Sequence, residues 1–413
     1  MNDTGVKQLR LLYLTAEQWP TFRPDLVSLF GKYLPRHGIT SDLVTERDPG
    51  AAANEDTPWP AGQARLCNVP RNRAGQYWLK LWHNLHVLVT LDATKYDAIQ
   101  VRDMSLTALA GLMVARMRGI QFYYWLSYPQ SEGQISRAWA RGLKGGMRFW
   151  FPLLQGSFGK WLLYRVVLPR ADHVFVQSHQ MQRDMARQGI PMAQMTPVPM
   201  GVDAELVRPE KIRPVDDVRL AGKRVLVYLG SLDPLRQIDI LLQMLVHVRE
   251  STPNILLVVV GDTGDATHSE WLKQEAARLG VAELVIWTGW LESSLAWRYA
   301  RSAEIGLSPI PRGYLLDMGS PTKAVEYMAL GLPVIVNDNP DQAEVVAESG
   351  AGLCVTLAPE LFAESVVRLL GDSGLRQNMG EAGRQYVTKF RTYDKLTCAL
   401  AAKYRALQTG TPK

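Results

Sequence analysis

Residues 319–336 have the sequence GSPTKAVEYMALGLPVIV, in which a short helical pattern runs directly into an apolar strand pattern. Ser320 is a favourable N-cap residue, and Pro321 suits the first helical position. Gly331 and Pro333 end the helix, and the β-branched residues that follow predict a strand over 333–336. A helix followed at once by a short apolar strand is typical of parallel α/β units.

The same alternation of short apolar runs and longer helical patterns extends along the whole chain. In the second half, strands are expected over 225–229, 255–260, 284–287, 305–307, 333–336 and 352–355. In the first half, they are expected over 11–14, 41–44, 98–101, 122–126, 173–176 and 195–198. Each half therefore predicts one open α/β sheet of about six strands.

The length of 413 residues favours two domains, because a single core stops growing at about 250–300 residues. Residues 201–223 are charged, contain two prolines and lack periodic apolar residues, so they are expected to join the domains. We place the N-terminal domain at 1–205 and the C-terminal domain at 206–390. Apolar residues at helical spacing over 391–413 predict a final amphipathic helix.

Two turns that follow predicted strands place a cation near a helix start. After the strand over 225–229, Asp233 is a favourable N-cap and Pro234 fits the first helical position. Arg236 then takes the third position, as Lys323 does in the helix described above. A cation there is disfavoured by the helix dipole by roughly 0.3–1 kcal/mol. Either both cations reach into solvent, or a polyanion such as a diphosphate contacts them together with the helix amides.

Residues 320–335 closely resemble the donor-site signature of the retaining glycosyltransferases of family 4, which have the GT-B fold. Four earlier segments, at 199–203, 228–232, 258–262 and 287–290, are also similar to the family's pattern and occur in the family's order. The resemblance implies an α/β protein of two Rossmann-like domains whose parallel sheets face a central cleft. The N-terminal domain would hold the acceptor and the C-terminal domain the nucleotide sugar, and the last helix would cross back onto the N-terminal domain.

The resemblance implies transfer of a hexosyl unit from a UDP- or GDP-sugar to a glycan or lipid-linked acceptor, in polysaccharide or glycolipid biosynthesis of the bacterial surface type. Arg236 matches the family's phosphate-binding lysine. Glu326 matches the second glutamate of its paired-glutamate motif, and we expect its carboxylate to accept hydrogen bonds from ribose hydroxyls. Gly319 matches the glycine that follows the first glutamate.

Two donor-side positions depart from the family pattern. Ser231 stands where an arginine is common, and Lys323 is a candidate to replace that arginine. Met318 stands where the first glutamate is expected, and Asp317 is the nearest carboxylate that could replace it; otherwise it only caps its own loop. Trp290 either stacks on the donor base or packs in the protein. The remaining candidates for contact with the nucleotide sugar are Gly230, Ser320 and Thr322.

The acceptor side is less well defined by the sequence. Residues 17–24 occupy the place of the family's glycine-rich acceptor loop, and Ser127 stands about where a histidine often lies near the transferred sugar. Arg102 and Asp103 follow the strand over 98–101, where they either face the cleft or form a structural salt bridge. The acceptor-side candidates are Trp19, Phe22, Arg23, Arg102 and Asp103, and the catalytic candidates are Arg236, Lys323, Asp317 and Ser127.

Residues 133–171 contain no Asp or Glu, and basic residues alternate there with aromatic ones. We expect residues 137–170 to bind an anionic membrane surface. Lys160 and Arg165 interrupt the segment, so it should not span. The alternative is a solvated basic loop, or one that lines an acceptor groove.

Other classes of chemistry lack their signatures. The chain has no Asp-x-Asp and no His or Cys cluster with ligand spacing, so neither a metal nor a cofactor is expected. The formal charge of +6 is not accompanied by a nucleic-acid-binding motif. Glycine-rich dinucleotide and Walker loops are missing as well. The polar N-terminus, which lacks a signal pattern, predicts a cytoplasmic protein. Binding through residues 137–170 would place it peripherally on the inner face of the membrane. A GT-B sugar-nucleotide epimerase and a noncatalytic GT-B partner remain as alternatives.

Overall fold

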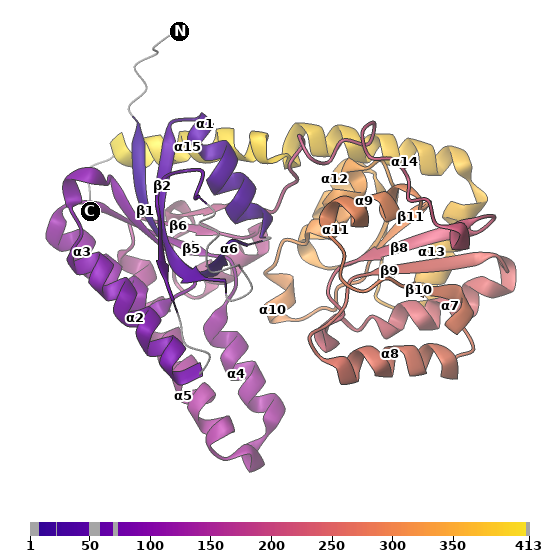
Figure 1. The fold of residues 1–413 in the computed structure, drawn as a ribbon, viewed down its shortest axis with the longest axis horizontal. Coiled ribbons are helices and arrows are strands. Elements are labelled where there is room, and N and C mark those ends of the chain that lie inside the picture. Colours follow the sequence, from indigo (N-terminus) through magenta and orange to yellow (C-terminus); the bar gives the residue numbers. More distant parts are fainter. Residues whose placement is uncertain (1–7, 22, 49–57, 69–72, 410–413) are drawn as a thin grey trace, which may run out of the picture. The chain divides into compact units, whose positions relative to one another are not determined.

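The computed structural model describes residues 8–21, 23–48, 58–68 and 73–409, which form two compact units (Figure 1). Unit 1 comprises Met1–Pro199 together with Tyr393–Lys413, and unit 2 comprises Met200–Thr392. The chain therefore leaves unit 1, builds unit 2 and returns to unit 1 with its last helix.

Unit 1 contains a parallel sheet in the order β3-β2-β1-β4-β5-β6-β7. Its strands are β1 (Leu9–Trp19), β2 (Ile39–Arg47), β3 (Ala64–Cys67), β4 (Ala98–Arg102), β5 (Gln121–Leu126), β6 (His173–Val176) and β7 (Met195–Pro197). In the centre, Leu11 pairs with Ser41 on one side and with Ala98 on the other. The central strands are buried along nearly their whole length, as expected for a parallel sheet covered on both faces.

Helices connect these strands and cover the sheet. They are α1 (Leu34–Arg36), which continues a π-helical stretch over Asp25–Tyr33, then α2 (Arg73–Val89), α3 (Ser105–Arg118), α4 (Gln130–Arg141), α5 (Met147–Leu162) and α6 (His179–Arg187). The last helix, α15 (Tyr393–Thr409), also belongs to this core. Tyr404 packs its ring 4.8 Å from that of Phe175 and donates a hydrogen bond to Gln100. The expected return of the last helix onto the N-terminal domain is thus confirmed.

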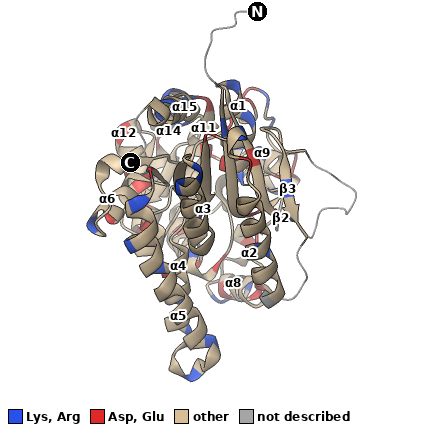
Figure 2. Cartoon of the chain, turned by 90° about the vertical axis from the view of Figure 1, so that its left-hand side faces the viewer, with Lys and Arg blue, Asp and Glu red and all other residues tan. Residues whose placement is uncertain are grey.

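Helices α4 and α5 form a helical pair that extends away from the sheet of unit 1, with Lys and Arg residues near its end (Figure 2). Glycine allows the two helices to approach closely. A Cβ atom on Gly156 would lie 2.7 Å from the backbone oxygen of Ser131, and one on Gly159 would lie 2.8 Å from the hydroxyl of Ser131. Larger residues at these two positions would force the pair apart.

Unit 2 contains a second parallel sheet in the order β10-β9-β8-β11-β12-β13. Its strands are β8 (Arg224–Leu229), β9 (Ile255–Val260), β10 (Val285–Trp287), β11 (Ile305–Ser308), β12 (Val334–Asn337) and β13 (Gly352–Val355). Helices α7 (Asp239–Ser251), α8 (Ala266–Arg278) and α13 (Pro359–Gly371) share one core cluster with the sheet. Helices α9 (Ser293–Arg301), α11 (Thr322–Ala329) and α12 (Pro340–Ser349) share a second one. Two parallel sheets in Rossmann-like units confirm the expected fold class.

Three local expectations need correction. The short strand β3 was not anticipated, because its four residues alternate too little to be distinguished from a loop. The helix after β8 does not start at Pro234: that residue begins a 3-10 turn that ends at Arg236, and α7 starts only at Asp239. Gln237, with φ of 49°, separates the 3-10 turn from α7. Finally, Ser320 is not the N-cap of α11, which begins one residue later than expected, after Pro321.

Candidate active site

The turn after β8 approaches the turn after β9 through two glycines. Gly230 has φ of 143° and Gly261 has φ of 129°, both in a region that favours glycine. A Cβ atom on Gly261 would lie 2.1 Å from the carbonyl oxygen of Gly230, so only a glycine fits. The two strand ends therefore meet backbone to backbone at the carboxyl edge of the sheet, where ligands of open parallel sheets bind.

Lys323, in the first turn of α11, reaches the same turn from the other side. Its ammonium nitrogen lies 5.2 Å from the centre of the Tyr228 ring, a distance at which the ring face attracts a cation. A Cβ atom on Gly230 would lie 2.9 Å from Cε of Lys323, so the lysine stem passes directly along the glycine. Tyr228 is fixed in turn, since its hydroxyl donates to the backbone oxygen of Ser231 at 3.1 Å. The structure thus brings together both turns that the sequence singled out.

Positive charge in this cluster is not balanced by an ion pair. Among the residues that the structure describes, neither Lys323 nor Arg236 forms a salt bridge or a side-chain hydrogen bond. Burial, together with the nearby charge of Arg236, lowers the pKa of Lys323 to about 7, although Glu326 acts in the opposite direction. Such a cationic cluster is short of negative charge, and a bound anion would restore the ordinary protonation of the lysine.

The first turn of α11 offers backbone N–H groups next to these cations. Its N-cap position is Pro321, and no side chain caps the helix. Ser320 is buried and serves another purpose: its hydroxyl accepts a hydrogen bond from the backbone N–H of Met200 at 2.9 Å and donates to Asp341 at 2.8 Å. Thr322, partly buried, begins the helix. An uncapped helix start beside two cations is an anion-binding arrangement.

Glu326 lies one turn after Thr322, on the partly buried side of α11. Burial raises the pKa of Glu326 to about 7, and Lys323 acts in the opposite direction. Within the described residues its carboxylate accepts no hydrogen bond. A carboxylate with free oxygens beside an anion-binding helix start is able to accept hydrogen bonds from hydroxyl groups of a ligand.

The segment before α11 holds the position where the family pattern has its first glutamate. Met318 is fully buried, and Gly319 links it to Ser320. Asp317 ends the short helix α10 (Tyr314–Asp317) and forms a bidentate ion pair with Arg312, at 3.0 and 3.1 Å. It also accepts the backbone N–H of Gly313 at 3.2 Å. In this structure Asp317 is therefore held by its own loop.

Trp290 is the remaining donor-side candidate. It follows β10, and its side chain is 65 % exposed, so it does not pack in a core. The preceding Gly289 forms an isolated bridge with Gly261, which places this loop beside the two glycine turns described above. The indole is therefore exposed on a loop that adjoins the cationic cluster.

In unit 1, the candidates Arg102, Asp103 and Ser127 form one buried network at the ends of β4 and β5. Arg102 is fully buried; its guanidinium donates to Asp25 at 2.7 Å and to the hydroxyl of Ser127 at 3.2 Å. Ser127 in turn donates its hydroxyl to Asp103, and its backbone N–H donates to the same carboxylate at 2.9 Å. Asp103 adopts a φ of 54°, unusual for a residue other than glycine.

Ion pairing extends this network to the loop after β1. Arg23 donates to Asp25 at 3.0 Å and to Glu17 at 2.7 Å. Burial opposes the ionisation of Asp25, but the guanidinium groups of Arg102 and Arg23 outweigh it and hold the pKa of Asp25 below its ordinary value. Burial raises the pKa of Asp103, with Arg102 acting against it. The salt-bridged interpretation of Arg102 thus fits the geometry, with Asp25 as its principal partner.

The loop candidates on the acceptor side have different surroundings. Trp19 is buried and packs edge to face on Trp59, with ring centres 5.0 Å apart, so its indole is part of the core of unit 1. Phe22 lies outside the described residues. Glu17 and Arg23 are partly exposed, so solvent reaches both side chains of this ion pair.

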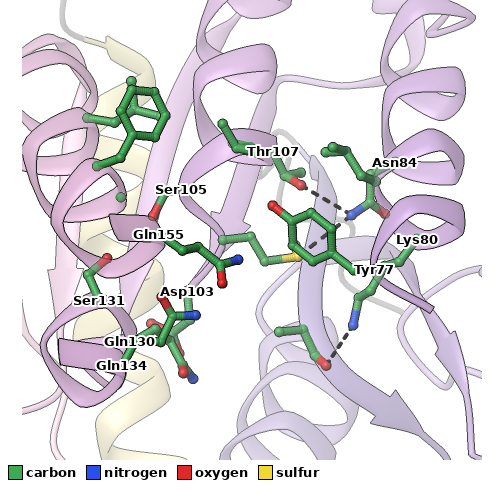
Figure 3. Close-up of a pocket in the computed structure, with 17 residues that line it drawn as sticks. Tyr77, Lys80, Asn84, Asp103, Ser105, Thr107, Gln130, Ser131, Gln134 and Gln155 are labelled. Carbon is green, nitrogen blue, oxygen red and sulfur yellow. Dashed lines mark hydrogen bonds between the residues drawn. The ribbon is translucent and has the colours of Figure 1, made fainter. Parts of the chain in front are cut away.

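A cavity of about 300 Å³ in unit 1 was not anticipated from the sequence. Helices α2, α3, α4 and α5 enclose it, together with the ends of β1 and β4 (Figure 3). Amide and hydroxyl side chains line much of it, among them Asn84, Gln134 and Gln155. Scattered glutamines in helices carry no recognisable sequence signal, which is why these residues were missed.

The part of the chain that the structure describes offers neither a cluster of metal ligands nor a membrane-spanning helix. That part contains no group of three or more His, Cys, Asp or Glu side chains placed to hold a metal ion. None of its helices combines the length and the apolar character needed to cross a bilayer.

Two family models match the chain in succession. The model for glycosyl transferase 4-like domains matches residues 26–201, and the model for glycosyl transferases group 1 matches residues 215–386. D-inositol 3-phosphate glycosyltransferase of Segniliparus rotundus is 30 % identical over 218 residues, which cover 52 % of this chain and 47 % of the relative. A GDP-mannose-dependent phosphatidylinositol monomannoside mannosyltransferase of Mycobacterium tuberculosis is 30 % identical over 233 residues, covering 55 % and 60 %. The chain thus spans about half the length of these curated relatives.

Solved structures agree on the fold. Sucrose-phosphate synthase of Thermosynechococcus elongatus superposes with a TM-score of 0.71 at 18 % identity, over 97 % of this chain and 99 % of the other. The Anabaena HepE protein in complex with UDP-glucose gives a TM-score of 0.70 at 16 % identity, over 97 % and 100 %. With the family models, the two parallel sheets and the returning helix in agreement, the chain belongs to the family 4 glycosyltransferases of the GT-B fold.

Proposed function

We propose that this protein is a retaining glycosyltransferase that moves a hexosyl unit from a nucleoside diphosphate sugar to a glycan or lipid-linked acceptor. The observation that supports this best is the ammonium group of Lys323, which lies over Tyr228 and beside Gly230 without a carboxylate partner among the described residues. A diphosphate supplies the missing negative charge and accepts hydrogen bonds from the uncapped start of α11.

The same groups suit the chemistry of transfer. When the bond between the sugar and the diphosphate breaks, negative charge develops on the leaving phosphate. Lys323, Arg236 and the N–H groups of α11 stabilise that charge, and electrostatic stabilisation of this kind often contributes more to catalysis than any other effect. Lys323 needs no metal ion to act in this way. Its ordinary pKa returns when the diphosphate binds, so the lysine is fully charged at the moment the leaving group departs.

Glu326 and Trp290 complete the proposed donor site. The free oxygens of Glu326 accept hydrogen bonds from the ribose hydroxyls, and the exposed indole of Trp290 stacks on the base. One relative is named as GDP-mannose-dependent, and one solved neighbour was crystallised with UDP-glucose. Both donor types are therefore reasonable first choices for an assay.

We further propose that the enzyme works at an anionic membrane surface, to which the α4–α5 pair attaches it, in polysaccharide or glycolipid biosynthesis. The outer surface of α5 exposes apolar side chains, among them Trp150, Phe151, Leu154 and Trp161. Cations surround them, with Arg137, Arg141, Lys144 and Arg148 all exposed near the end of the pair (Figure 2). Interfacial helices combine these two features, because the apolar face enters the headgroup region while the cations attract anionic lipids.

Glu132 and Lys160 give this helical pair an internal tie. The ammonium of Lys160 lies 3.7 Å from the buried carboxylate of Glu132, which also accepts the hydroxyl of Tyr164 at 2.6 Å. The cation that interrupts the aromatic sequence of α5 is thus paired with a carboxylate of α4, while its side chain stays 38 % exposed.

A second candidate is a noncatalytic GT-B partner that binds nucleotide without turnover. It is favoured by one specific observation: Met318 is buried where the family pattern has a glutamate, while Asp317 is occupied by Arg312. Product analysis separates the functions. Release of nucleoside diphosphate that depends on added acceptor supports transfer, a changed free sugar nucleotide supports epimerisation, and binding without any turnover supports the partner role.

A further inference from the structure

The cavity in unit 1 lies among residues that the donor chemistry does not use. Figure 3 shows Gln130, Gln134 and Gln155 on the side formed by α4 and α5, while Tyr77 and Asn84 project from α2 on the other side. The floor is formed by Asp103 and its neighbours, at the carboxyl end of β4. The cavity therefore occupies the edge of the sheet at which ligands of parallel α/β domains bind.

The walls carry many neutral hydrogen-bonding groups with no protein partner. Gln130, Gln134 and Gln155 form no side-chain hydrogen bond to another described residue. Asn84 is buried; its amide nitrogen donates to Thr107 at 3.3 Å, but its amide oxygen has no partner within the described structure. Amides both donate and accept, so they match the hydroxyl groups of a polyhydroxylated ligand.

The charged groups of the wall are already paired, which argues against a charged ligand. Lys80 donates to the backbone oxygen of Ala16 at 2.9 Å and lies 3.4 Å from the carboxylate of Glu46. Asp103 accepts the backbone N–H and the hydroxyl of Ser127. With both charges satisfied inside the protein, a neutral occupant costs the least desolvation.

Two aromatic side chains in the wall connect the cavity to the proposed membrane surface. Tyr77 of α2 and Phe158 of α5 both line it, and both are partly exposed, at 43 % and 55 %. The neighbouring positions Trp78 and Trp82 of α2 are exposed as well, and so is Trp161 of α5. A molecule that reaches the cavity from a membrane enters past these rings.

We propose that this cavity binds the head group of the acceptor, and that the head group is a neutral sugar or cyclitol carried by a membrane lipid. The proposal rests on the proposed function and names the class of its acceptor. The amides contact the hydroxyl groups, and the two aromatic rings contact the apolar ring faces and the adjoining chain. The lipid tail stays in the membrane to which the α4–α5 pair attaches the enzyme.

Thiol protection tests this directly. In Gln155→Cys, the introduced thiol lies in the cavity wall, and its rate of maleimide labelling is measured by peptide mass spectrometry. The control is Ser157→Cys, on the exposed surface of the same helix, and the exposed native Cys354 and Cys398 serve as internal standards. Gln134→Cys repeats the test from α4, so a folding failure of one variant does not decide the outcome.

Phosphatidylserine vesicles with and without monoglucosyl diacylglycerol are compared, so that contact with the membrane itself is the same in both arms. The glycolipid should slow labelling at position 155 about fourfold when its head group is present at about three times the dissociation constant. Labelling at position 157 and at the native cysteines should be equal in the two arms. Equal labelling at 155 with both vesicles would overturn the proposal, and equal protection by free methyl glucoside at the same head-group concentration would overturn the lipid source.

Nucleoside diphosphate binding to the same variants is measured by calorimetry. Because the cavity lies in unit 1 and Lys323 in unit 2, Gln155→Cys should bind the nucleotide as the unmodified protein does. Lost protection with intact nucleotide binding would refute the cavity assignment alone. Protection without any nucleotide binding would instead refute the donor site and leave the cavity ligand in place.

Discussion

The ammonium nitrogen of Lys323 lies 5.2 Å from the centre of the Tyr228 ring. A side chain from the first turn of α11 thus contacts the carboxyl end of β8. Ring contact compensates only part of the cost of placing a cation in this partly buried position. A bound diphosphate would remove the rest of this free-energy cost, because it supplies the negative charge that the Lys323 ammonium lacks.

Removing either cation should weaken nucleotide binding. We expect Lys323→Ala and Arg236→Ala each to reduce the affinity for UDP or GDP by about 1.5–3 kcal/mol, because each change removes a charge-assisted hydrogen bond. Calorimetric titration measures this, and Lys273→Ala, at an exposed position of α8, should bind like the unmodified protein. Unchanged affinity in both site variants would contradict the anion site.

Nucleotide binding should take up a proton near neutral pH. The pKa of Lys323 is about 7 in the free protein, and a bound diphosphate raises it towards the ordinary value of a lysine. Above pH 7 the free lysine is mostly neutral, so binding must protonate it, and the affinity should fall as the pH rises from 7 to 9. Calorimetry at pH 8 in buffers of different ionisation enthalpy should detect the uptake, which should vanish in Lys323→Ala. No uptake in the unmodified protein would refute the assignment.

Substitutions of Asp317 and Glu326 should affect different steps if both residues contact the donor. Asp317→Ala should abolish transfer while leaving nucleoside diphosphate affinity intact, whereas Glu326→Ala should weaken that affinity itself. Arg312→Ala is a matched control, because it breaks the same ion pair but keeps the carboxylate. Normal turnover in folded Asp317→Ala, with a loss of stability similar to that of Arg312→Ala, would mean that Asp317 only holds its loop.

Sedimentation with vesicles should depend on the α4–α5 pair. Replacing Trp150 and Phe151 with serine should reduce binding to phosphatidylserine vesicles, because the two rings are exposed and apolar. Replacing Arg141 and Arg148 with alanine should cost about 1 kcal/mol per residue and flatten the salt dependence. The control Trp271→Ser alters an exposed tryptophan of unit 2. Equal sedimentation of all variants at low salt would rule out this membrane contact.

Arg102 should prove to be a structural residue. Arg102→Met leaves Asp25 buried without its principal partner, so the free energy of unfolding should fall by about 3–5 kcal/mol. Arg118→Met, at an exposed position of α3, should change it by less than about 0.5 kcal/mol. Denaturant unfolding provides the measurement. A stable Arg102→Met protein with impaired transfer would instead place Arg102 among the residues that contact the acceptor.

The sequence predicts the sheets well because local patterns and burial agree there. The apolar run over 255–260 is long enough to read as a buried strand, and β9 occupies the same residues. Helix starts are harder to predict: Ser320 has the composition of an N-cap, but Asp341 and the backbone of Met200 engage its hydroxyl, and only tertiary contacts decide between the two roles.

Candidate site residues also differ in whether the local sequence pattern reveals them. Lys323 stands out in the sequence because it breaks a helix rule within its own segment, and the first turn of α11 does contain it. Arg236 was selected by the same rule, but it ends a 3-10 turn before α7, so for Arg236 the rule does not apply. The partner of Arg102 cannot be predicted from the sequence, because Asp25 lies far away in the chain and approaches Arg102 only in the folded protein. The glutamines of the cavity break no local rule either, since an amide suits an exposed helix position as well as a cavity wall.

Because α15 belongs to the core of unit 1, that unit cannot finish folding until residues 393–409 have been synthesised. Tyr393, Leu400 and Tyr404 fill its core, yet all of unit 2 emerges from the ribosome before them. At about 5–20 residues per second, this interval lasts roughly 10–40 seconds. Throughout it, the sheet of unit 1 exposes the apolar surface that α15 will later cover. The nascent protein is therefore expected to need chaperone protection at this surface, and a chain that stops before residue 393 should aggregate even though the strands of both sheets are complete.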